Sequence, residues 1–255
     1  MALRRHRGAK AVVVAAALAT AWSCAREHER EGVHWTYAGE AGPAGWSTLS
    51  PDFKTCGAGQ RQSPIDIANP AQAPLAPVQL HYSGATTTMI NNGHAIQLGV
   101  EPGNWVEIGG KRADLSQIHL HSPSEHRVGG EQFPLEAHFV HVGEGGSLTV
   151  LAVLYRTGET SPMLTRIVAG MAGGAKEATP FTATLSEFGP GSTSSYFHYE
   201  GSLTTPPCTE GVAWYVSQDV KSASADQAAA VVRLTGENAR PVQPLHGRQV
   251  LQSAK

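Results

Sequence analysis

Two histidine-bearing segments with the alternating pattern of β-strands constrain most strongly how this chain can fold. His119 and His121 lie two residues apart in the first segment, and His138 lies in the second, over residues 135–141. Side chains at positions i and i+2 of a strand leave the same face of a sheet. Past a Gly-Gly turn signal at residues 129–130, the second segment can pair antiparallel with the first and bring His138 to that face. The sequence therefore predicts three converging imidazoles.

Three imidazoles on rigid strands suit a divalent metal of the zinc kind, with bonds of about 2.0 to 2.1 Å and a fourth tetrahedral position left open, as in catalytic sites. Gln117 and Glu136 each precede a histidine by two residues, so each can accept the free ring N–H of that ligand. A His-x-His pair alone is a weak signal, and the third histidine after an acid strengthens it. We predict a catalytic Zn²⁺ site. The geometry of three histidine ligands does not exclude cobalt from such a site.

The N-terminal stretch has the pattern of a secretory signal. Four basic residues precede a short apolar run over residues 11–21, which is too short to span a bilayer comfortably. This pattern predicts a signal peptide over residues 1–23 with cleavage near 21–24, followed by a flexible segment over 24–32 and one domain over 33–252. Cleavage after Ala21 and lipidation of Cys24, as in a bacterial lipoprotein, are both open. The expected location is periplasmic or secreted, with a membrane anchor if Cys24 carries lipid.

Composition is that of a globular enzyme, with 41% apolar and 16% charged residues. The formal charge is −2 with the signal included, and without its four basic residues 15 basic residues face 21 acidic ones. No basic stripe occurs, so nucleic acid is not an expected partner. In an oxidising compartment Cys56 and Cys208 can form a disulfide, and the alternative is two buried thiols.

Short alternating segments separated by Gly, Asn, Pro and Asp predict a mainly β chain. Helix is expected only over residues 163–171 and 224–234, and residues 39–72 are expected to be irregular. Two threonines precede Pro206 and Pro207, which predicts a stiff loop with constrained hydroxyls. The expected strands cover residues 78–82, 86–91, 94–98, 105–108, 115–121, 135–141 and 148–155.

Taken together, these motifs resemble the α-class carbonic anhydrases, in particular the secreted or periplasmic bacterial type, over residues 33–251. Their order and approximate spacing agree with that family. The motifs are Trp35-Thr36-Tyr37, Arg61-Gln62-Ser63-Pro64-Ile65-Asp66-Ile67, Asn91-Asn92-Gly93-His94-Ala95, Gln117-Ile118-His119-Leu120-His121, Ser124-Glu125-His126, Glu136-Ala137-His138-Phe139-Val140-His141, Gly201-Ser202-Leu203-Thr204-Thr205-Pro206-Pro207 and Arg240-Pro241-Val242-Gln243-Pro244-Leu245.

The resemblance implies a single domain with a central twisted, mostly antiparallel sheet of about ten strands and small peripheral helices. It implies the following roles: His119, His121 and His138 as zinc ligands; Gln117, Glu136 and Asn238 as acceptors behind them; His94, Thr204 and Glu125 as catalytic residues; Tyr37, Asn92 and His94 on the proton path; Val140, Val153, Leu203, Thr204, Thr205 and Trp214 at the substrate; and Cys56 with Cys208 as a disulfide.

The implied reaction is reversible hydration of carbon dioxide to bicarbonate and a proton, by attack of zinc-bound hydroxide, with a histidine proton shuttle (a lyase, carbonate dehydratase). Zinc lowers the pKa of water from 15.7 to about 7, and an imidazole with a pKa near 6.5 can accept and release the proton. Sulfonamides and anions are expected as inhibitors at zinc, and an esterase side activity is plausible. A homodimer is an open possibility.

Two other classes of protein share parts of this pattern. A cupin has a similar His-x-His and carboxylate pattern, but it requires glycine where this chain has Ala113 and Gln132. A non-catalytic binding module of the carbonic anhydrase type characteristically lacks a zinc ligand, whereas this chain keeps all three together with Thr204 and Glu125. Zinc content after dialysis would distinguish an enzyme from such a module.

Overall fold

The computed structural model describes residues 33–189 and 195–253. Its helices are α1 (Trp46–Leu49), α2 (Thr55–Ala58), α3 (Pro162–Gly170), α4 (Leu185–Phe188) and α5 (Ala225–Thr235), with 3-10 turns η1 (Pro51–Phe53) and η2 (Glu144–Gly146). Its strands are β1 (Asp66–Ile67), β2 (Ala71–Ala73), β3 (Val78–His81), β4 (Thr86–Asn91), β5 (Ile96–Val100), β6 (Trp105–Ile108), β7 (Lys111–His121), β8 (Arg127–Val128), β9 (Glu131–Gln132), β10 (Leu135–Gly143), β11 (Leu148–Thr157), β12 (Thr179–Pro180), β13 (Tyr196–Ser202), β14 (Glu210–Ser217), β15 (Lys221–Ala223) and β16 (Leu251–Ser253).

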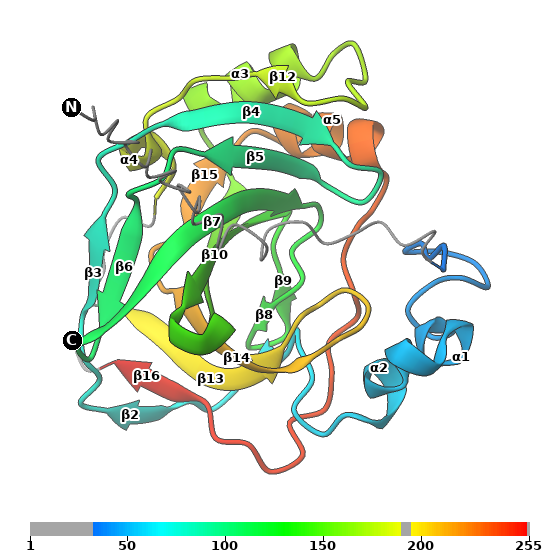
Figure 1. Cartoon of the computed structure of the whole chain (residues 1–255), viewed down its shortest axis with the longest axis vertical. Helices are drawn as coiled ribbons and strands as arrows, with labels where there is room; N and C mark the ends of the chain where they lie inside the picture. The colour runs from blue at the N-terminus through cyan, green and yellow to red at the C-terminus, as the bar shows by residue number, and fades with distance from the viewer. Residues whose placement is uncertain (1–32, 190–194, 254–255) are drawn as a thin grey trace, which may run out of the picture. The chain divides into compact units, whose positions relative to one another are not determined.

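One large twisted sheet organises the domain (Figure 1). Ten of its strands follow each other in the order β12-β4-β5-β7-β10-β11-β14-β13-β16-β2, and β3, β6 and β15 join this path from the side. Most neighbours are antiparallel, while β11 pairs parallel with β14 and β15, and β16 pairs parallel with β2. The predicted fold is therefore confirmed, and parallel pairing occurs where the chain returns to the sheet after a long connection.

The central strands β7, β10 and β11 have one apolar face and one face that bears the histidines. Ile118 and Leu120 of β7 and Ala137 and Phe139 of β10 are fully buried in the larger hydrophobic core. The alternate residues of both strands point to the opposite face, as the period of two requires. A second hydrophobic cluster, which includes Trp214 of β14, lies on that opposite face.

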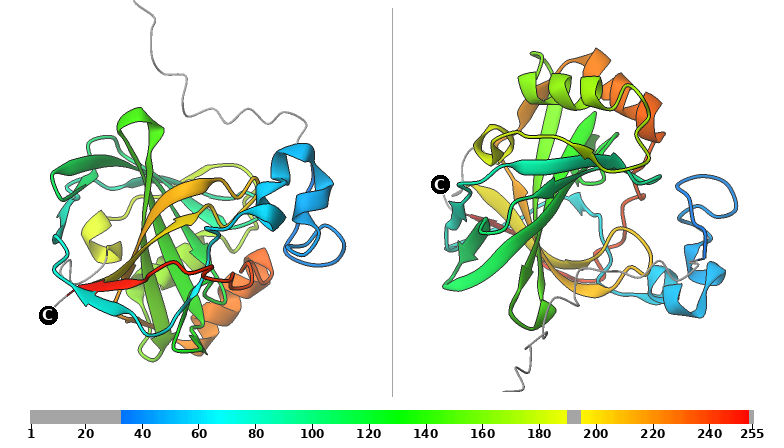
Figure 2. Two further views of the ribbon diagram at one scale, coloured as in Figure 1. Left: turned by 90° about the horizontal axis from the view of Figure 1, so that it is seen from below. Right: turned by 45° about the horizontal axis from the view of Figure 1, so that its top comes forward.

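Helices α3 and α5 lie side by side against the larger core (Figure 2). Both helices were predicted from the sequence, and their starts follow the expected capping chemistry. Ser161 caps α3, and Ser224 forms a capping box with Gln227 at the start of α5. The short helices α1, α2 and α4 were not predicted, because one helical turn carries no apolar period that a sequence pattern could reveal.

The turn signal at Gly129 and Gly130 forms a tight hairpin between β8 and β9. Both glycines have positive φ, 59° and 83°, which a two-residue hairpin turn of this kind requires. The hairpin lies inside the connection from β7 to β10, and the two histidine strands pair directly with each other.

Cys56 of α2 and Cys208 form a disulfide. The bridge is buried in a third apolar cluster that contains Trp46 of α1, with Trp35 and Tyr37 packed against it. The backbone N–H of Cys208 donates to the carbonyl of Thr205 at 2.8 Å. The disulfide therefore ties the helices near the N-terminal side of the domain to the loop that carries Thr204 and Thr205.

No helix in the described ranges is long and apolar enough to cross a membrane. The predicted signal peptide, the segment over residues 24–32 and Cys24 lie outside the described residues.

His141 is a buried imidazole on β10 with both ring nitrogens in contact with polar partners. Its Nε2 lies 2.6 Å from the hydroxyl of Tyr82, and its Nδ1 lies 3.2 Å from the carbonyl of Thr149. Burial lowers the pKa of His141 to about 4, although hydrogen bonds to the backbone of Thr149 and Phe139 and the charge of Asp114 oppose that shift. The folded chain therefore keeps this imidazole neutral where the unfolded chain would protonate it.

We expect reduction of the disulfide to lower the melting temperature. The two cysteines are 152 residues apart, so their bridge restricts the unfolded chain strongly and is worth about 2 to 5 kcal/mol. Thermal melts with and without a strong reductant measure the difference. A Cys56→Ser, Cys208→Ser double variant is the control, because its melting temperature should match that of the reduced protein. An unchanged melting temperature under reductant would refute this expectation.

We also expect His141 to make the protein sensitive to acid. Between its unfolded pKa of about 6.5 and its folded pKa of about 4, the unfolded chain binds the extra proton. The contribution of His141 to the free energy of unfolding is therefore complete above pH 6.5. It falls by about 3 kcal/mol in all as the pH falls toward 4. Urea unfolding of the wild type and of His141→Gln at pH 7 and pH 4.5 tests this. The variant should be less stable at pH 7 and should lose less stability between the two values; an equal loss in both proteins would contradict it.

Candidate metal centre

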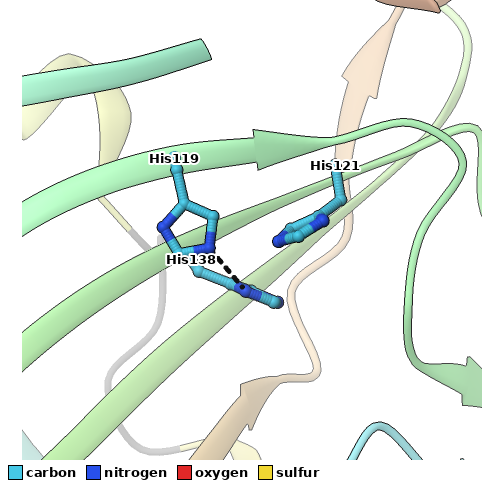
Figure 3. A group of neighbouring side chains, drawn as sticks. All are labelled: His119, His121 and His138. Atoms are coloured by element: carbon cyan, nitrogen blue, oxygen red, sulfur yellow. Dashed lines mark hydrogen bonds between the residues drawn. The ribbon is translucent and has the colours of Figure 1, made fainter. Parts of the chain in front are cut away.

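Strands β7 and β10 bring His119, His121 and His138 together. In their antiparallel register His138 is directly opposite His119, and Glu136 is opposite His121. Figure 3 shows the three rings pointing toward a common point, two from β7 and one from β10. His138 Nδ1 lies 3.2 Å from His119 Nε2, and one nitrogen from each ring lies within 4.8 Å of the others. The predicted convergence of these three side chains is therefore present.

Each of the three rings uses its other nitrogen on a hydrogen-bond acceptor, which fixes the ring's orientation and tautomer. The acceptors are those proposed from the sequence. The contacts are His119 Nδ1 to Gln117 Oε1 at 2.9 Å, His121 Nδ1 to the backbone oxygen of Asn238 at 2.7 Å, and His138 Nε2 to Glu136 Oε1 at 2.8 Å.

The free nitrogens fit a zinc-sized ion. Tetrahedral zinc with bonds of about 2.0 to 2.1 Å requires ligand nitrogens about 3.3 Å apart, and the pair formed by His119 and His138 is at 3.2 Å. The Nε2 of His121 is buried and has no hydrogen-bond partner among the described residues. Burial lowers the pKa of all three imidazoles, so each is neutral at pH 7 and can offer a lone pair.

The buried carboxylate of Glu136 supports His138 from behind. Its Oε1 accepts from His138 and, at 2.7 Å, from His126 Nδ1, while its Oε2 accepts the backbone N–H groups of Glu125 and His126 at 2.8 Å each. Burial would raise the pKa of Glu136, but the charges and hydrogen bonds of the two histidines outweigh it and hold that pKa well below its usual range. Glu136 is therefore a fixed negative charge behind the site.

A second buried carboxylate, Glu125, faces the three histidines directly. Its Oε2 lies 3.5 Å from His121 Nε2 and 3.9 Å from His138 Nδ1, and it has no hydrogen-bond partner among the described residues. Its Oε1 accepts the backbone N–H of Arg240 at 2.9 Å. Burial raises the pKa of Glu125 to about 7, although His138, the Arg240 backbone and a hydrogen bond from Thr204 oppose that shift. Thr204 is itself buried.

His94 lies on the connection between β4 and β5 and is half-buried. Its ring stacks face to face on Trp35, with centroids 3.7 Å apart and planes inclined by 7°. Burial, with a smaller effect of the charge of His34, lowers its pKa below 6.5. The side chain of Asn92 accepts the backbone N–H of His94 at 3.0 Å, which shapes the turn. The ring is therefore restrained on one face.

Tyr37 lies near the same group of residues. Burial raises its pKa, and the negative charge of Glu125 raises it further. The phenol is therefore neutral at pH 7 and is close enough to Glu125 to respond to its charge. The proton-path role expected for Tyr37 stays a prediction.

An apolar surface lies beside the histidines, and one residue expected on it is elsewhere. Val153 of β11 pairs with Ala137, so it belongs to the larger core on the opposite face of the sheet, and its assignment as a substrate contact is wrong. Val150 takes that place, because it pairs with Val140 in β10 and with Trp214 in β14. A shift of three residues along a strand changes the face that a side chain occupies.

The remaining expected substrate contacts lie on strands β10 and β14 and on the loop between β13 and β14 that carries Cys208. Leu203 packs against the same apolar cluster as Val140 and Trp214, and its backbone N–H donates to Thr209 at 2.9 Å. Thr205 is half-buried beside Thr204. The Trp214 ring centroid is 4.9 Å from that of His138. These side chains therefore border the three histidines on the side of the second hydrophobic cluster.

Sequence patterns missed several residues that support the site. The hydroxyl of Tyr199 is 2.6 Å from His126 Nε2 and 2.9 Å from Ser63 Oγ, which continues the chain of contacts behind Glu136. The guanidinium of Arg240 donates to the carbonyls of Ser63 and Cys56 at 2.7 and 2.8 Å. These partners are far apart in sequence, so no local spacing could have revealed the pairings.

Comparison with known proteins yields consistent matches. The family model for eukaryotic-type carbonic anhydrase matches residues 41–254. The chain is 39% identical over 230 residues to a carbonic anhydrase of Pectobacterium carotovorum, covering 89% of this chain and 94% of that protein. It is 41% identical over 225 residues to one of Neisseria gonorrhoeae, covering 86% and 88%. The structure of α-carbonic anhydrase from Thermovibrio ammonificans in complex with the inhibitor sulfanilamide matches with a TM-score of 0.82 at 40% identity, covering 86% of this chain and 99% of that chain.

We expect Glu136→Ala to weaken zinc binding about 10- to 100-fold, because His138 loses the acceptor that sets its tautomer and His126 loses its partner as well. Competition with a chromophoric chelator measures the affinity. Gln117→Ala is the matched control: Gln117 accepts only from His119, whereas Glu136 also holds His126 and two backbone N–H groups, so the loss of Gln117 should weaken binding less. Equal affinities of Glu136→Ala and the wild type would show that the carboxylate does not act on the metal site.

Proposed function

The chain belongs to the eukaryotic-type carbonic anhydrase family, enzymes of the lyase class that hydrate carbon dioxide, and we propose that it does so with zinc held by His119, His121 and His138. One observation carries the proposal. The three rings direct a free nitrogen toward one another, while every opposite nitrogen is held by an acceptor. Such an arrangement satisfies the rings everywhere except where a cation would bind.

Zinc bound there would lower the pKa of a water molecule from 15.7 to about 7 and thereby supply a nucleophile at neutral pH. The protein's own task is to present that nucleophile to carbon dioxide in the correct orientation. Two strands supply all three ligands, so the ligands are fixed by the same hydrogen-bonded sheet that forms the core. A site built on strands holds its geometry better than one built on loops.

Thr204 and Glu125 would select the orientation of the nucleophile. An ionised carboxylate only accepts hydrogen bonds, so the hydroxyl of Thr204 must be the donor in its hydrogen bond with Glu125. The oxygen of Thr204 can then act only as an acceptor toward the reacting oxygen. The raised pKa of Glu125 near 7 describes a carboxylate that burial makes reluctant to ionise, and a cation held by the nearby ring nitrogens would favour its charged form.

The apolar surface formed by Val140, Val150, Leu203 and Trp214 suits carbon dioxide, which has no net dipole and little capacity for hydrogen bonding. Because Val140, Val150 and Trp214 lie side by side on adjacent strands, they form a continuous wall. Such a wall would keep water from competing for the position of carbon dioxide. We infer that Val150 has the role first assigned to Val153.

His94 would carry the proton away from the site. Its pKa is lowered from 6.5 by burial, so the imidazole is neutral at pH 7 and can take up a proton and release it quickly to buffer. We propose Tyr37 and Asn92 for the rest of the proton path, and Asn92 also shapes the turn that holds His94. The stack on Trp35 restrains the ring without using either of its nitrogens.

We propose further that the same site hydrolyses activated esters, because their carbonyl carbon is an electrophile of the same kind. Sulfonamides and small anions are the expected inhibitors, since each offers a negative donor atom to the open coordination position. Export to the periplasm or the cell exterior is part of the proposal, and the disulfide between Cys56 and Cys208 supports an oxidising compartment. Lipidation of Cys24 and a homodimer stay as predictions.

We expect stopped-flow measurements on the zinc-loaded chain to show rapid hydration of carbon dioxide. His119→Ala should reduce the rate more than about 100-fold, because the effect of losing a ligand exceeds that of losing a residue behind one. A sulfonamide should inhibit the wild type. His81→Ala, which changes an exposed histidine on β3, is the matched control and should be active. A folded, zinc-loaded wild type without hydration would instead favour a non-catalytic binding module.

A further inference from the structure

We propose that the side chains of Asn91 and Asn238 form a clamp that fixes the loop bearing His94, residues 92–95, relative to the metal centre. They would be positioning residues for the transfer of the proton to His94. This inference rests on the proposed function, because it assumes that His94 is the proton shuttle. It assigns the side chain of Asn238 a role separate from that of its backbone oxygen, which accepts from His121.

Asn238 uses every polar atom of its side chain to join the loop to strand β7. Its Nδ2 donates to the carbonyl of His94 at 3.0 Å and to that of Leu120 at 2.9 Å. Its Oδ1 accepts the backbone N–H of Ser122 at 2.8 Å. The partners fix the orientation of the amide, because a rotated amide would place its NH₂ against the N–H of Ser122 and its oxygen against two carbonyls.

The position of Asn238 explains why a side chain is needed there. Strand β5 pairs with β7 from Ile96, opposite Leu120, to Gly99, opposite Gln117. His94 lies two residues before this ladder begins, so its carbonyl has no strand partner in the paired stretch. The amide of Asn238 bridges the gap and is itself fully buried. A bond between buried groups holds its geometry better than one exposed to water.

Asn91 holds the other side of the loop to the same segment of the chain. Its Nδ2 donates to the carbonyl of Leu234 at the end of α5 at 2.7 Å, and its Oδ1 accepts the N–H of Gly93 at 3.0 Å. Leu234 and Asn238 are only four residues apart, so the end of α5 and the chain just after it hold the loop at both ends. Gly236, at φ 73°, allows the sharp turn between these two contacts.

Within the clamp the loop is a rigid unit. Asn92 Oδ1 accepts the backbone N–H groups of His94 and Ala95 at 3.0 and 2.9 Å. Loss of a contact to Leu234 or Asn238 would let the turn move relative to β7 and open these two bonds more often. The rate of proton transfer depends steeply on such displacements, whereas the reaction of carbon dioxide at the three histidines does not involve the loop.

The test compares Asn91→Asp, Asn238→Ala and His94→Ala in the zinc-loaded full chain, with Gln79→Ala, an exposed amide on β3, as the matched control. Asn91→Asp keeps the acceptor for Gly93 and replaces the donor to Leu234 by an oxygen, and it touches no metal ligand. In weak buffer we expect kcat to fall about five- to ten-fold for Asn91→Asp, toward the value of His94→Ala, with kcat/KM changed less than about two-fold. Asn238→Ala should lower kcat in the same way and should lower kcat/KM as well, because the backbone oxygen of Asn238 accepts from His121. Added imidazole should raise kcat of Asn91→Asp and His94→Ala to one common level.

A second readout is independent of catalysis. Amide hydrogen exchange at His94 and Ala95 should be about five- to ten-fold faster in Asn91→Asp than in the wild type, with and without zinc, and unchanged in Gln79→Ala. In Asn91→Asp, equal losses of kcat and kcat/KM, or an unchanged kcat with faster exchange, would overturn the positioning role. If His94→Ala keeps full kcat in weak buffer, the proposed proton shuttle fails, and the catalytic role of the clamp fails with it. If His94→Ala has a low kcat while the kcat of Asn91→Asp is unchanged, the shuttle holds and only the clamp fails.

Discussion

The antiparallel register that sets His138 opposite His119 is the constraint on which the rest of this structure depends. Along β7 and β10 each histidine alternates with a residue of the larger core, and four of those core residues, Ile118, Leu120, Ala137 and Phe139, are fully buried. A slip of one residue would exchange the two faces and place the imidazoles in the larger core. Since each large buried apolar side chain contributes about 1.5 to 3 kcal/mol, the core holds the histidines in place.

Around those histidines the buried polar groups fall into two sets. The groups behind the rings are satisfied, and Glu136 alone accepts four hydrogen bonds. The groups in front are not: His121 Nε2 and Glu125 Oε2 lack hydrogen-bond partners among the described residues and lie 3.5 Å apart. Leaving buried polar atoms unpaired is unfavourable. The satisfied set makes the site rigid, and the unsatisfied set gives it affinity for a cation and for polar reactants.

Local sequence patterns predicted the features that depend on the period of a strand or helix. Contacts between residues far apart in the sequence depend on the tertiary structure, and local patterns did not predict them. The face shared by the three histidines, the acceptors at Gln117 and Glu136, and helices α3 and α5 all follow from such periods. Resemblance supplied Asn238, whose contact with His121 joins residues 117 positions apart. It misplaced Val153, because the register of β11 against β10 is set by side-chain packing and cannot be read from β11 alone. The stack of His94 on Trp35 and the side-chain bonds of Asn238 and Arg240 also needed the folded chain.

The segment after α5 has little regular secondary structure, yet it supplies the acceptor for His121 through Asn238 and the donor to Glu125 through Arg240. Both residues are synthesised long after β7 and β10, which carry all three histidines. During translation a nascent chain can therefore pair its histidine strands while one ring still lacks its acceptor and Glu125 still lacks its backbone donor. Chain order thus separates the pairing of the two histidine strands from completion of the site, and the full set of partners exists only once this irregular segment has docked.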